Sequence, residues 1–334
     1  MRALTVVPGA VVLAERPDPV PGAGEVVVSV HSCGICGSDV HGVESGRAAP
    51  GSVLGHEFAG TIVEVGRGAG EWRTGQAVAV NPLGSCGACD ACRRGFPFLC
   101  PSPNIGLTAP GGFAELVAVP GSQLHALPDG LDVELGAHVE PLAVALRAVE
   151  LAGWSPGDDA VVFGVGSIGL SVILALRASG AGRIVAFGRS PGRRAAAARV
   201  GADLVLDARE TSVTSHVAAT GDRVSAVFEC SGAQEAVAAC TPALAAGGTI
   251  VEVGLPQGPA PVDLAVFVGQ NLHLVGSCAF DVGHYRAALH LVASGAVDFE
   301  PLVSERVTLA DAPDAFRRLA APQDLVGVLV QPWR

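Results

Sequence analysis

Positive charge is scarce in this sequence of 334 residues. Lysine and arginine together number 21 against 32 aspartates and glutamates, which gives a net charge of −11 at pH 7. Because phosphate binding needs a basic surface, this balance argues against a nucleic-acid partner. Like charges form no block that reads as an interaction tail. Charged residues make up 16% and hydrophobic residues 49% of the chain, a composition typical of a globular protein.

The sequence also lacks a recognisable leader and a membrane-spanning segment. The first residues, MRALTVVPGAVVLAE, contain no apolar core followed by a small-residue cleavage site, so secretion is not expected. One uncharged run, residues 160–176, contains three glycines and is shorter than the roughly 20 residues that a spanning helix needs. We therefore expect a cytoplasmic protein with no membrane partner. Its nine cysteines should then be reduced thiols, with metal ligation favoured over disulfides.

The length and the change of pattern along the chain predict two domains. Up to about residue 150, Gly- and Pro-rich stretches separate short β-branched runs such as 25–30 and 60–65, which predicts a compact β-rich domain. Beyond residue 159, buried-strand runs alternate with helical stretches, including an alanine-rich helix at 193–200. This alternation predicts a parallel, doubly wound sheet. The six runs are 160–163, 183–187, 204–206, 226–228, 249–253 and 272–275.

The alternation of strand and helix patterns becomes less regular toward the C-terminus. It predicts a helix at 285–294 and a final strand at 327–330. Spacing alone leaves two places for this strand, the edge of the doubly wound sheet or the first domain.

A glycine-rich loop follows the first strand of the second domain and opens an apolar helix. The pattern G-x-G-x-x-G suits a dinucleotide site, since the three glycines allow a tight turn, close approach of a pyrophosphate and packing of helix on strand. The amides at the start of the helix would bind the phosphates. A purely structural turn is the alternative. The predicted cofactor-binding residues here are Gly164, Gly166, Ser167, Ile168 and Gly169.

The end of the second predicted strand bears on the choice of cofactor. NAD-binding proteins place an acidic residue about 20 residues beyond the glycine loop, on the ribose 2′-hydroxyl. Here the chain has Gly188, Arg189, Ser190 and Arg193, with no carboxylate. Arginine and a serine hydroxyl suit a 2′-phosphate, so NADP(H) is favoured over NAD(H). The alternative is that these arginines are solvated residues at the start of a helix.

Four cysteines lie within fifteen residues in the pattern C-x-x-C-x-x-C-x7-C. Cys86, Cys89, Cys92 and Cys100 could supply four thiolates to a closed, tetrahedral, structural zinc. With every position taken by sulfur, such a zinc would stabilise the loop and perform no chemistry. An iron–sulfur cluster and four incidental buried cysteines are the alternatives.

A second, dispersed set consists of Cys36, His56 and Glu57. One thiolate, one imidazole and one carboxylate leave a position open, as a catalytic zinc requires. Taken singly, His56 could be an ordinary core histidine and Cys36 a buried thiol.

Several motifs occur in one order along nearly the whole chain. They are C-G-x-C-G-S-D-x-H at 33–41, G-H-E-F-x-G at 55–60, the four-cysteine loop, G-G-F-A-E at 111–115, Glu140-Pro141-Leu142 and the glycine loop. Together they resemble the zinc-dependent medium-chain alcohol dehydrogenases, in particular the branch of sorbitol and threonine dehydrogenases. The resemblance implies an α/β fold. A GroES-like β-rich catalytic domain (1–150, completed by 283–334) would hold an inserted Rossmann domain (151–282), with the active site in the cleft.

The resemblance also implies the residue roles. Cys36 and His56 correspond to zinc ligands, and either Glu57 or Glu140 to a carboxylate ligand. Ser38 corresponds to the hydroxyl that takes the alcohol proton and passes it through the cofactor ribose to His41, although His41 could be a plain surface histidine. The implied reaction is hydride transfer between a secondary alcohol and NADP(H), with two zinc ions per chain.

Two departures from the family pattern limit the substrate assignment. Polyol dehydrogenases of this branch commonly carry an arginine where this chain runs Ser277-Cys278-Ala279-Phe280, and an aromatic residue where Gly42 stands. Both departures weaken a sorbitol-type assignment. An NAD-dependent polyol or amino-alcohol dehydrogenase remains the alternative, and a non-catalytic nucleotide-binding protein a remote one. The family also implies a homodimer or homotetramer.

Overall fold

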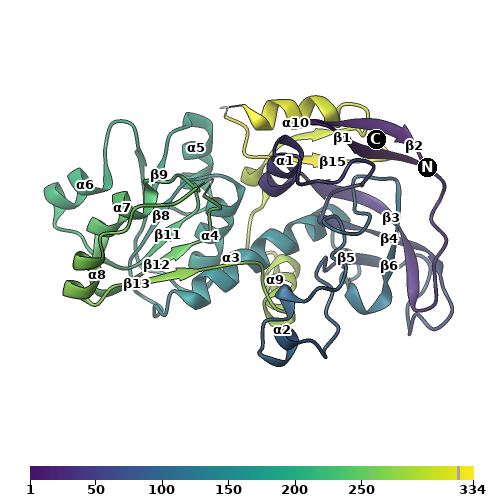
Figure 1. Ribbon diagram of the computed structural model, residues 1–334, viewed down its shortest axis with the longest axis horizontal. Helices are drawn as coiled ribbons and strands as arrows, with labels where there is room; N and C mark the ends of the chain where they lie inside the picture. The colour runs from purple at the N-terminus through teal and green to yellow at the C-terminus, as the bar shows by residue number, and fades with distance from the viewer. Residues whose placement is uncertain (257, 322–323) are drawn as a thin grey trace. The chain divides into compact units, whose positions relative to one another are not determined.

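The computed structural model describes residues 1–256, 258–321 and 324–334. It divides into two compact units, which we describe separately (Figure 1). The first unit contains Met1–Glu140, Asp281–Gly295 and Val303–Arg334, and the second contains Pro141–Phe280 and Ala296–Leu302. Across the described residues, every helix is too short or too polar to cross a membrane.

The first unit is built on a mostly antiparallel sheet of seven strands. The strand order is β14-β15-β3-β4-β5-β7, with β6 paired to β3, and a separate hairpin is formed by β1 and β2. The strands are β1 (Arg2–Val7), β2 (Ala10–Glu15), β3 (Glu25–Gly34), β4 (Glu57–Val65), β5 (Ala77–Val80), β6 (Leu116–Pro120), β7 (Leu124–Ala126), β14 (Val303–Val307) and β15 (Gly327–Val330).

The β-branched runs predicted as strands form the centre of this sheet. Val28 on β3 and Ile62 on β4 are fully buried, and the two strands pair along most of their length. The final strand, β15, pairs with Cys33 and Gly34 of β3, which places it in the first unit rather than in the doubly wound sheet. Phe113 and Phe316 stack edge to face at 5.5 Å, so the C-terminal segment shares the core of the N-terminal one.

The second unit contains the six predicted parallel strands. Their order is β10-β9-β8-β11-β12-β13, the doubly wound arrangement, and every pair is parallel. The order reverses between β8 and β11, and ligands bind such sheets at the carboxyl ends of the strands flanking that point. The strands are β8 (Ala160–Phe163), β9 (Ile184–Gly188), β10 (Leu204–Asp207), β11 (Val224–Glu229), β12 (Leu244–Glu252) and β13 (His273–Gly276).

Helices cover both faces of this parallel sheet. In the second unit α4 packs on β8 and α5, whereas α7 and α8 pack on β12 (Figure 1). The helices of the chain are α1 (Gly37–Glu44), α2 (Asp90–Arg93), α3 (Val139–Leu151), α4 (Ser167–Ala178), α5 (Pro191–Arg199), α6 (Val213–Thr220), α7 (Ala236–Cys240), α8 (Leu264–Gln270), α9 (Val282–Ser294) and α10 (Ala312–Ala320). Short 3-10 turns are η1 (Pro97–Leu99), η2 (Gly121–Gln123), η3 (Val133–His138), η4 (Thr241–Ala243) and η5 (Glu300–Leu302).

Candidate active site and metal centres

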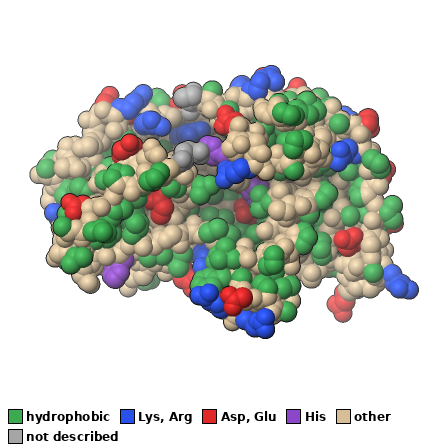
Figure 2. Space-filling model, viewed as in Figure 1, with side chains coloured by type: hydrophobic (Ala, Val, Ile, Leu, Met, Phe, Trp, Pro, Cys, Tyr) green, Lys and Arg blue, Asp and Glu red, His purple; other side chains and the backbone are tan. Residues whose placement is uncertain are grey.

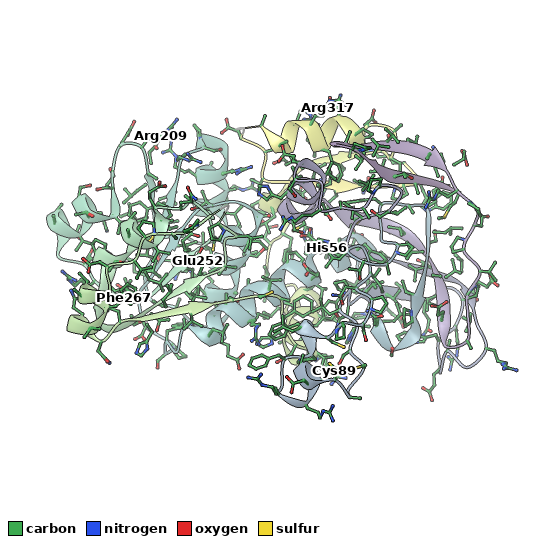
Figure 3. The ribbon with its side chains drawn as sticks, viewed as in Figure 1. His56, Cys89, Arg209, Glu252, Phe267 and Arg317 are labelled. Atoms are coloured by element: carbon green, nitrogen blue, oxygen red, sulfur yellow. The ribbon has the colours of Figure 1, made fainter. Side chains whose placement is uncertain are left out.

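Strand pairing in the first unit gathers three of the predicted ligands. Gly34, at the end of β3, lies opposite Glu57, at the start of β4. This register brings Cys36, two residues after β3, beside Glu57 and His56. His56 is labelled in Figure 3. One ligand atom from each of the three lies within 4.8 Å of the others. A Cβ on Gly34 would overlap the Glu57 carboxylate, so the glycine leaves room for that side chain.

Asp39, to which no role was predicted above, contacts two of these residues. Its carboxylate accepts a hydrogen bond from the Cys36 backbone N–H at 3.1 Å, and its other oxygen lies 3.4 Å from Nδ1 of His56. Asp39 is the third residue of α1, and Cys36 is the residue that caps that helix. An acid three residues after a cap is a known helix-start pattern, so the signal was present in the sequence. A carboxylate on one imidazole nitrogen orients the other nitrogen toward a metal.

The charge of this cluster fits a bound cation. Burial raises the pKa of Glu140 to about 8, in spite of the nearby His56, and burial also raises the pKa of Glu57. Burial raises the pKa of the Cys36 thiol as well. Several buried acids thus surround one imidazole, which is unfavourable unless a positive charge compensates them. Glu140, at the start of α3, interacts with His56 and Glu57 but lies outside the group of three ligand atoms.

The two predicted relay residues lie on α1. Ser38 and His41 are three positions apart and therefore project from neighbouring positions on the helix. Both are exposed, and Nδ1 of His41 lies 3.9 Å from the Glu44 carboxylate. An exposed imidazole at this position can exchange protons with water.

The four-cysteine loop forms a second cluster in the first unit. The sulfurs of Cys86, Cys89, Cys92 and Cys100 all lie within 4.8 Å of one another. Cys89 is labelled in Figure 3. Backbone N–H groups point at them: Cys89 N–H donates to Cys86 Sγ at 3.3 Å, and Cys86 N–H to Cys100 Sγ at 3.3 Å. Hydrogen bonds from Ser102 and Cys86 lower the pKa of Cys100 to about 6. Four thiolates held this way suit a closed tetrahedral zinc.

The glycine loop of the second unit has the geometry expected of a dinucleotide site. Gly164 has φ +95°, which a side chain would strain, and a Cβ there would lie 2.7 Å from the Ser231 nitrogen. Gly166 faces open space, where a phosphate can approach. A Cβ on Gly169 would overlap the Gly164 carbonyl oxygen, so helix and loop pack closely. Within the described structure, no side chain caps α4, which begins with Ser167 and Ile168. Its first N–H groups can therefore bind an anion.

The end of β9 places the residues predicted to select the cofactor. Gly188 is buried, and a Cβ on it would overlap Cγ2 of Val165 in the glycine loop. Arg189 is exposed, and Ser190 caps α5 by accepting a hydrogen bond from the Arg193 N–H at 3.3 Å.

Comparisons with known proteins agree with this architecture. Residues 22–129 match the family model of the alcohol dehydrogenase GroES-like domain, and residues 167–294 match that of the zinc-binding dehydrogenases.

The chain is also similar to proteins of named activity. It is 34% identical to 2-dehydro-3-deoxy-L-galactonate 5-dehydrogenase of Pseudoalteromonas atlantica, over 90% of this chain and 89% of the relative. It is 32% identical to sorbitol dehydrogenase of Bacillus subtilis, over 95% and 93%. Among solved structures, a protein of Sinorhizobium meliloti described as a zinc-binding dehydrogenase, with NADP bound, superposes with a TM-score of 0.92. It is 34% identical, over 99% of this chain and all of that one.

The family models together span most of the chain, and the relatives cover nearly all of it. The predicted fold is confirmed by the sheet order and by these matches. The chain belongs to the zinc-dependent medium-chain alcohol dehydrogenases, in the sorbitol dehydrogenase-like branch.

Proposed function

We propose that this enzyme interconverts a secondary alcohol and the matching ketone, with NADP(H) as hydride carrier. The observation that carries the proposal is the convergence of Cys36, His56 and Glu57, whose ligand atoms lie within 4.8 Å of one another beside the buried Glu140. One thiolate, one imidazole and one carboxylate form an open ligand set, which favours a catalytic zinc over a structural one.

Each side chain then has a part in the reaction. Cys36 and His56 would hold zinc, with Glu57 or Glu140 as the exchangeable carboxylate. When bound, zinc supplies Lewis acidity at the substrate oxygen, and the nicotinamide supplies the hydride acceptor. Ser38 accepts the proton of the alcohol hydroxyl, and His41 exchanges that proton with water. Cys86, Cys89, Cys92 and Cys100 would hold a second zinc that stabilises the loop.

The cofactor assignment depends on the end of β9. The glycine loop (Gly164, Gly166, Ser167, Ile168 and Gly169) would bind the pyrophosphate. Gly188, Arg189, Ser190 and Arg193 would accept a 2′-phosphate, with a guanidinium in place of the acid that a ribose hydroxyl needs. The NADP bound to the similar Sinorhizobium meliloti protein supports this assignment.

The substrate class follows from the relatives and the ligand set. Sorbitol and a sugar acid oxidised at carbon 5 are secondary alcohols, and both appear in the relatives' names. The chain lacks the arginine and the aromatic residue expected of a polyol pocket, at 277–280 and at Gly42. We therefore favour a small secondary alcohol, with an NAD-dependent polyol or amino alcohol as the second candidate.

Location and assembly belong to the same proposal. The nine cysteines are all free thiols, which supports a reducing cytoplasm.

β13 is an edge strand of the parallel sheet, and its Leu274 is exposed. An unpaired edge can join a second copy of the chain, so we propose a homodimer or a homotetramer. Light scattering of the intact chain tests this part.

The test of function is a rate comparison with NADP⁺ and NAD⁺ over primary, secondary, polyol and amino alcohols. We expect the highest kcat/KM with NADP⁺ and a secondary alcohol, and loss of that cofactor preference in Arg189→Asp. A preference for NAD⁺ would refute the cofactor assignment and leave the zinc mechanism intact. Binding of cofactor without turnover, in protein lacking zinc at Cys36, would favour the non-catalytic alternative.

A further inference from the structure

An ion pair joins the C-terminal segment of the first unit to η3, the turn that precedes Glu140. Nε of Arg306, on β14, donates to both carboxylate oxygens of Glu134 at 3.0 Å, and its Nη2 donates to Oε1 at 2.7 Å. The side-chain amide of Gln331 donates to Oε2 at 2.8 Å. These donors lie 172 and 197 residues away from Glu134 along the chain, so the contact exists only in the folded unit.

This ion pair is largely shielded from water. The chain contains no lysine, so the blue side chains in Figure 2 are arginines, and many of them project into solvent. The side chain of Arg306, in contrast, is 29% exposed and that of Glu134 is 13% exposed. A bidentate pair of arginine and carboxylate has a defined geometry, and removal of one partner leaves a buried charge uncompensated. The pair can therefore fix the position of η3.

The position of η3 bears on the predicted metal centre. η3 ends where α3 begins, and Glu140 is the second residue of α3. Glu140 interacts with His56 and Glu57. A Cβ on Gly136 of η3 would overlap the side chain of Ala59, two residues beyond Glu57 on β4, so η3 packs closely on this strand. Because apolar packing is not directional, it sets the separation of η3 from β4 better than the place of η3 along β4.

The same C-terminal segment also contacts the strand that leads to Cys36. β15 pairs with the end of β3, at Cys33 and Gly34. Gln331 follows β15 directly, and β14, which carries Arg306, pairs with β15. One segment thus connects the end of β3 with the turn before Glu140, the two places from which candidate ligands come.

We propose that Arg306 and Gln331 are positioning residues for the proposed catalytic zinc. They fix η3 through Glu134, and η3 in turn holds the Glu140 carboxylate within reach of that ion. The inference rests on the proposed function, which assigns the zinc and names Glu140 as one of two exchangeable carboxylates. The C-terminal segment then shapes the metal centre without contributing a ligand atom to it.

The test measures metal affinity and ligand geometry, and it does not depend on turnover. In the intact protein, with the four-cysteine loop filled with zinc, Co²⁺ is bound at the remaining centre. Competition with a chelator gives the affinity for Co²⁺, and the visible absorption of the bound ion reports the number and arrangement of its ligands. The variants are Arg306→Met, Arg306→Lys and Gln331→Leu, each made with and without Glu140→Gln.

The matched control is Arg318→Met. Arg318 forms the same kind of bidentate pair with Glu305, the residue before Arg306 on β14, at 2.7 and 2.6 Å. Its other carboxylate partner, Asp314, lies on α10. The control therefore removes an equal charge and an equal ion pair from the same segment, at partners on β14 and α10 instead of η3.

Simple electrostatics and a positioning role predict opposite results for Arg306→Met. The variant leaves Glu134 without its cation, and the added negative charge alone would tighten binding of Co²⁺. A positioning role predicts weaker binding, and we expect a loss of about tenfold, the lower end of what removal of an orienting partner causes. Arg306→Lys should recover part of it. Gln331→Leu, which removes one hydrogen bond and leaves the ion pair, should weaken binding about threefold.

Two comparisons show whether the effect passes through Glu140. Arg318→Met should stay within about twofold of the wild type, as expected for a more exposed ion pair. In the Glu140→Gln protein, Arg306→Met should change the affinity by less than about twofold, because the side chain through which it acts is already altered. The absorption of Co²⁺ in Arg306→Met should also approach that in Glu140→Gln.

The outcomes separate this inference from the proposed function. A wild type that binds no Co²⁺ outside the four-cysteine loop would refute the proposed function and the inference with it. Binding in the wild type, with Glu140→Gln unchanged, would overturn the inference alone, as would unchanged or tighter binding in Arg306→Met. Equal losses with and without Glu140→Gln, or an equal loss in Arg318→Met, would show a general structural effect and overturn it too. If Arg306→Met does not fold, Gln331→Leu with and without Glu140→Gln gives the same decision.

Discussion

Gly188→Ala is predicted to destabilise the protein, although the general rule for such a change predicts the reverse. Replacing glycine with alanine at an ordinary backbone conformation stabilises a protein by about 0.4–1 kcal/mol, because alanine lowers the conformational entropy of the unfolded chain. Gly188 has no positive φ, so the rule should apply. Its Cβ, however, would overlap Cγ2 of Val165 and lie 3.2 Å from Cγ of Arg194.

The size of the effect follows from packing. Forcing an extra carbon into a filled core costs about 1–3 kcal/mol of stability. The lower conformational entropy of the unfolded chain offsets about 0.4–1 kcal/mol of this cost. We therefore expect Gly188→Ala to lower the free energy of unfolding by about 1.3 kcal/mol, the difference between the midpoints of the two ranges. Val165→Ala alone should cost about 1.6 kcal/mol, at about 0.8 kcal/mol per buried carbon.

The double variant tests the cause. Because the new Cβ would occupy the space that Val165 vacates, Gly188→Ala with Val165→Ala should be no less stable than Val165→Ala alone. Urea unfolding of the four proteins, followed by circular dichroism and tryptophan fluorescence, measures the coupling. A Gly188→Ala protein as stable as the wild type would refute the overlap, and additive losses would show that Val165 is not its partner. The same reasoning predicts that Gly188→Asp supports NAD⁺ only when Val165 is also shortened.

Three further predictions concern the metal centres and a buried acid pair. Asp39→Asn should weaken zinc binding at Cys36 and His56 by about 10- to 100-fold, as loss of an orienting carboxylate does; competition with a chelator measures it, and an unchanged affinity would contradict the role of Asp39. Cys89→Ser should remove the four-cysteine zinc and lower stability while the other zinc stays, by metal analysis and thermal unfolding; retention of both ions would contradict the assignment. Glu252, in register with Glu229, has a pKa raised to about 8, first by its burial and then by Glu229. The folded state therefore keeps a proton that the unfolded state loses above its ordinary pKa of 4.5, so wild-type stability falls as pH rises toward 8. Glu252→Gln should lessen this fall, in urea unfolding from pH 6 to 9; parallel curves for the two proteins would contradict it.

Much of the fold and of the candidate site could be predicted from the spacing of residues that lie close together in the sequence. The six parallel strands, the glycine loop and the four-cysteine cluster were predictable because each depends on residues close together in the chain. Asp39 and Asp207 were not assigned, for a physical reason. Each acid has one partner close by in the sequence, Cys36 for Asp39 and Arg209 for Asp207. The other partner comes from a different element: His56 reaches Asp39 through the pairing of β3 and β4, and Arg194 reaches Asp207 through the packing of α5 beside β10. The sequence showed that no acid stands at the end of β9. It did not show that Asp207, at the end of β10, lies beside that position.

The two proposed metal centres differ in how far apart their candidate ligands lie along the chain, and this difference predicts an order of metal uptake during folding. All four cysteines of one centre come from a single short loop, 86–100, so that centre can close with little loss of chain entropy. The other centre requires Cys36 to lie beside His56, and this arrangement exists only once β3 and β4 have paired. It also requires Glu140, which lies much later in the chain. During refolding with zinc present, the loop should therefore take up its ion first, and the reactive centre should fill only in chains whose sheet is already formed. Partly folded chains would then carry the structural ion without the ion that makes the enzyme reactive.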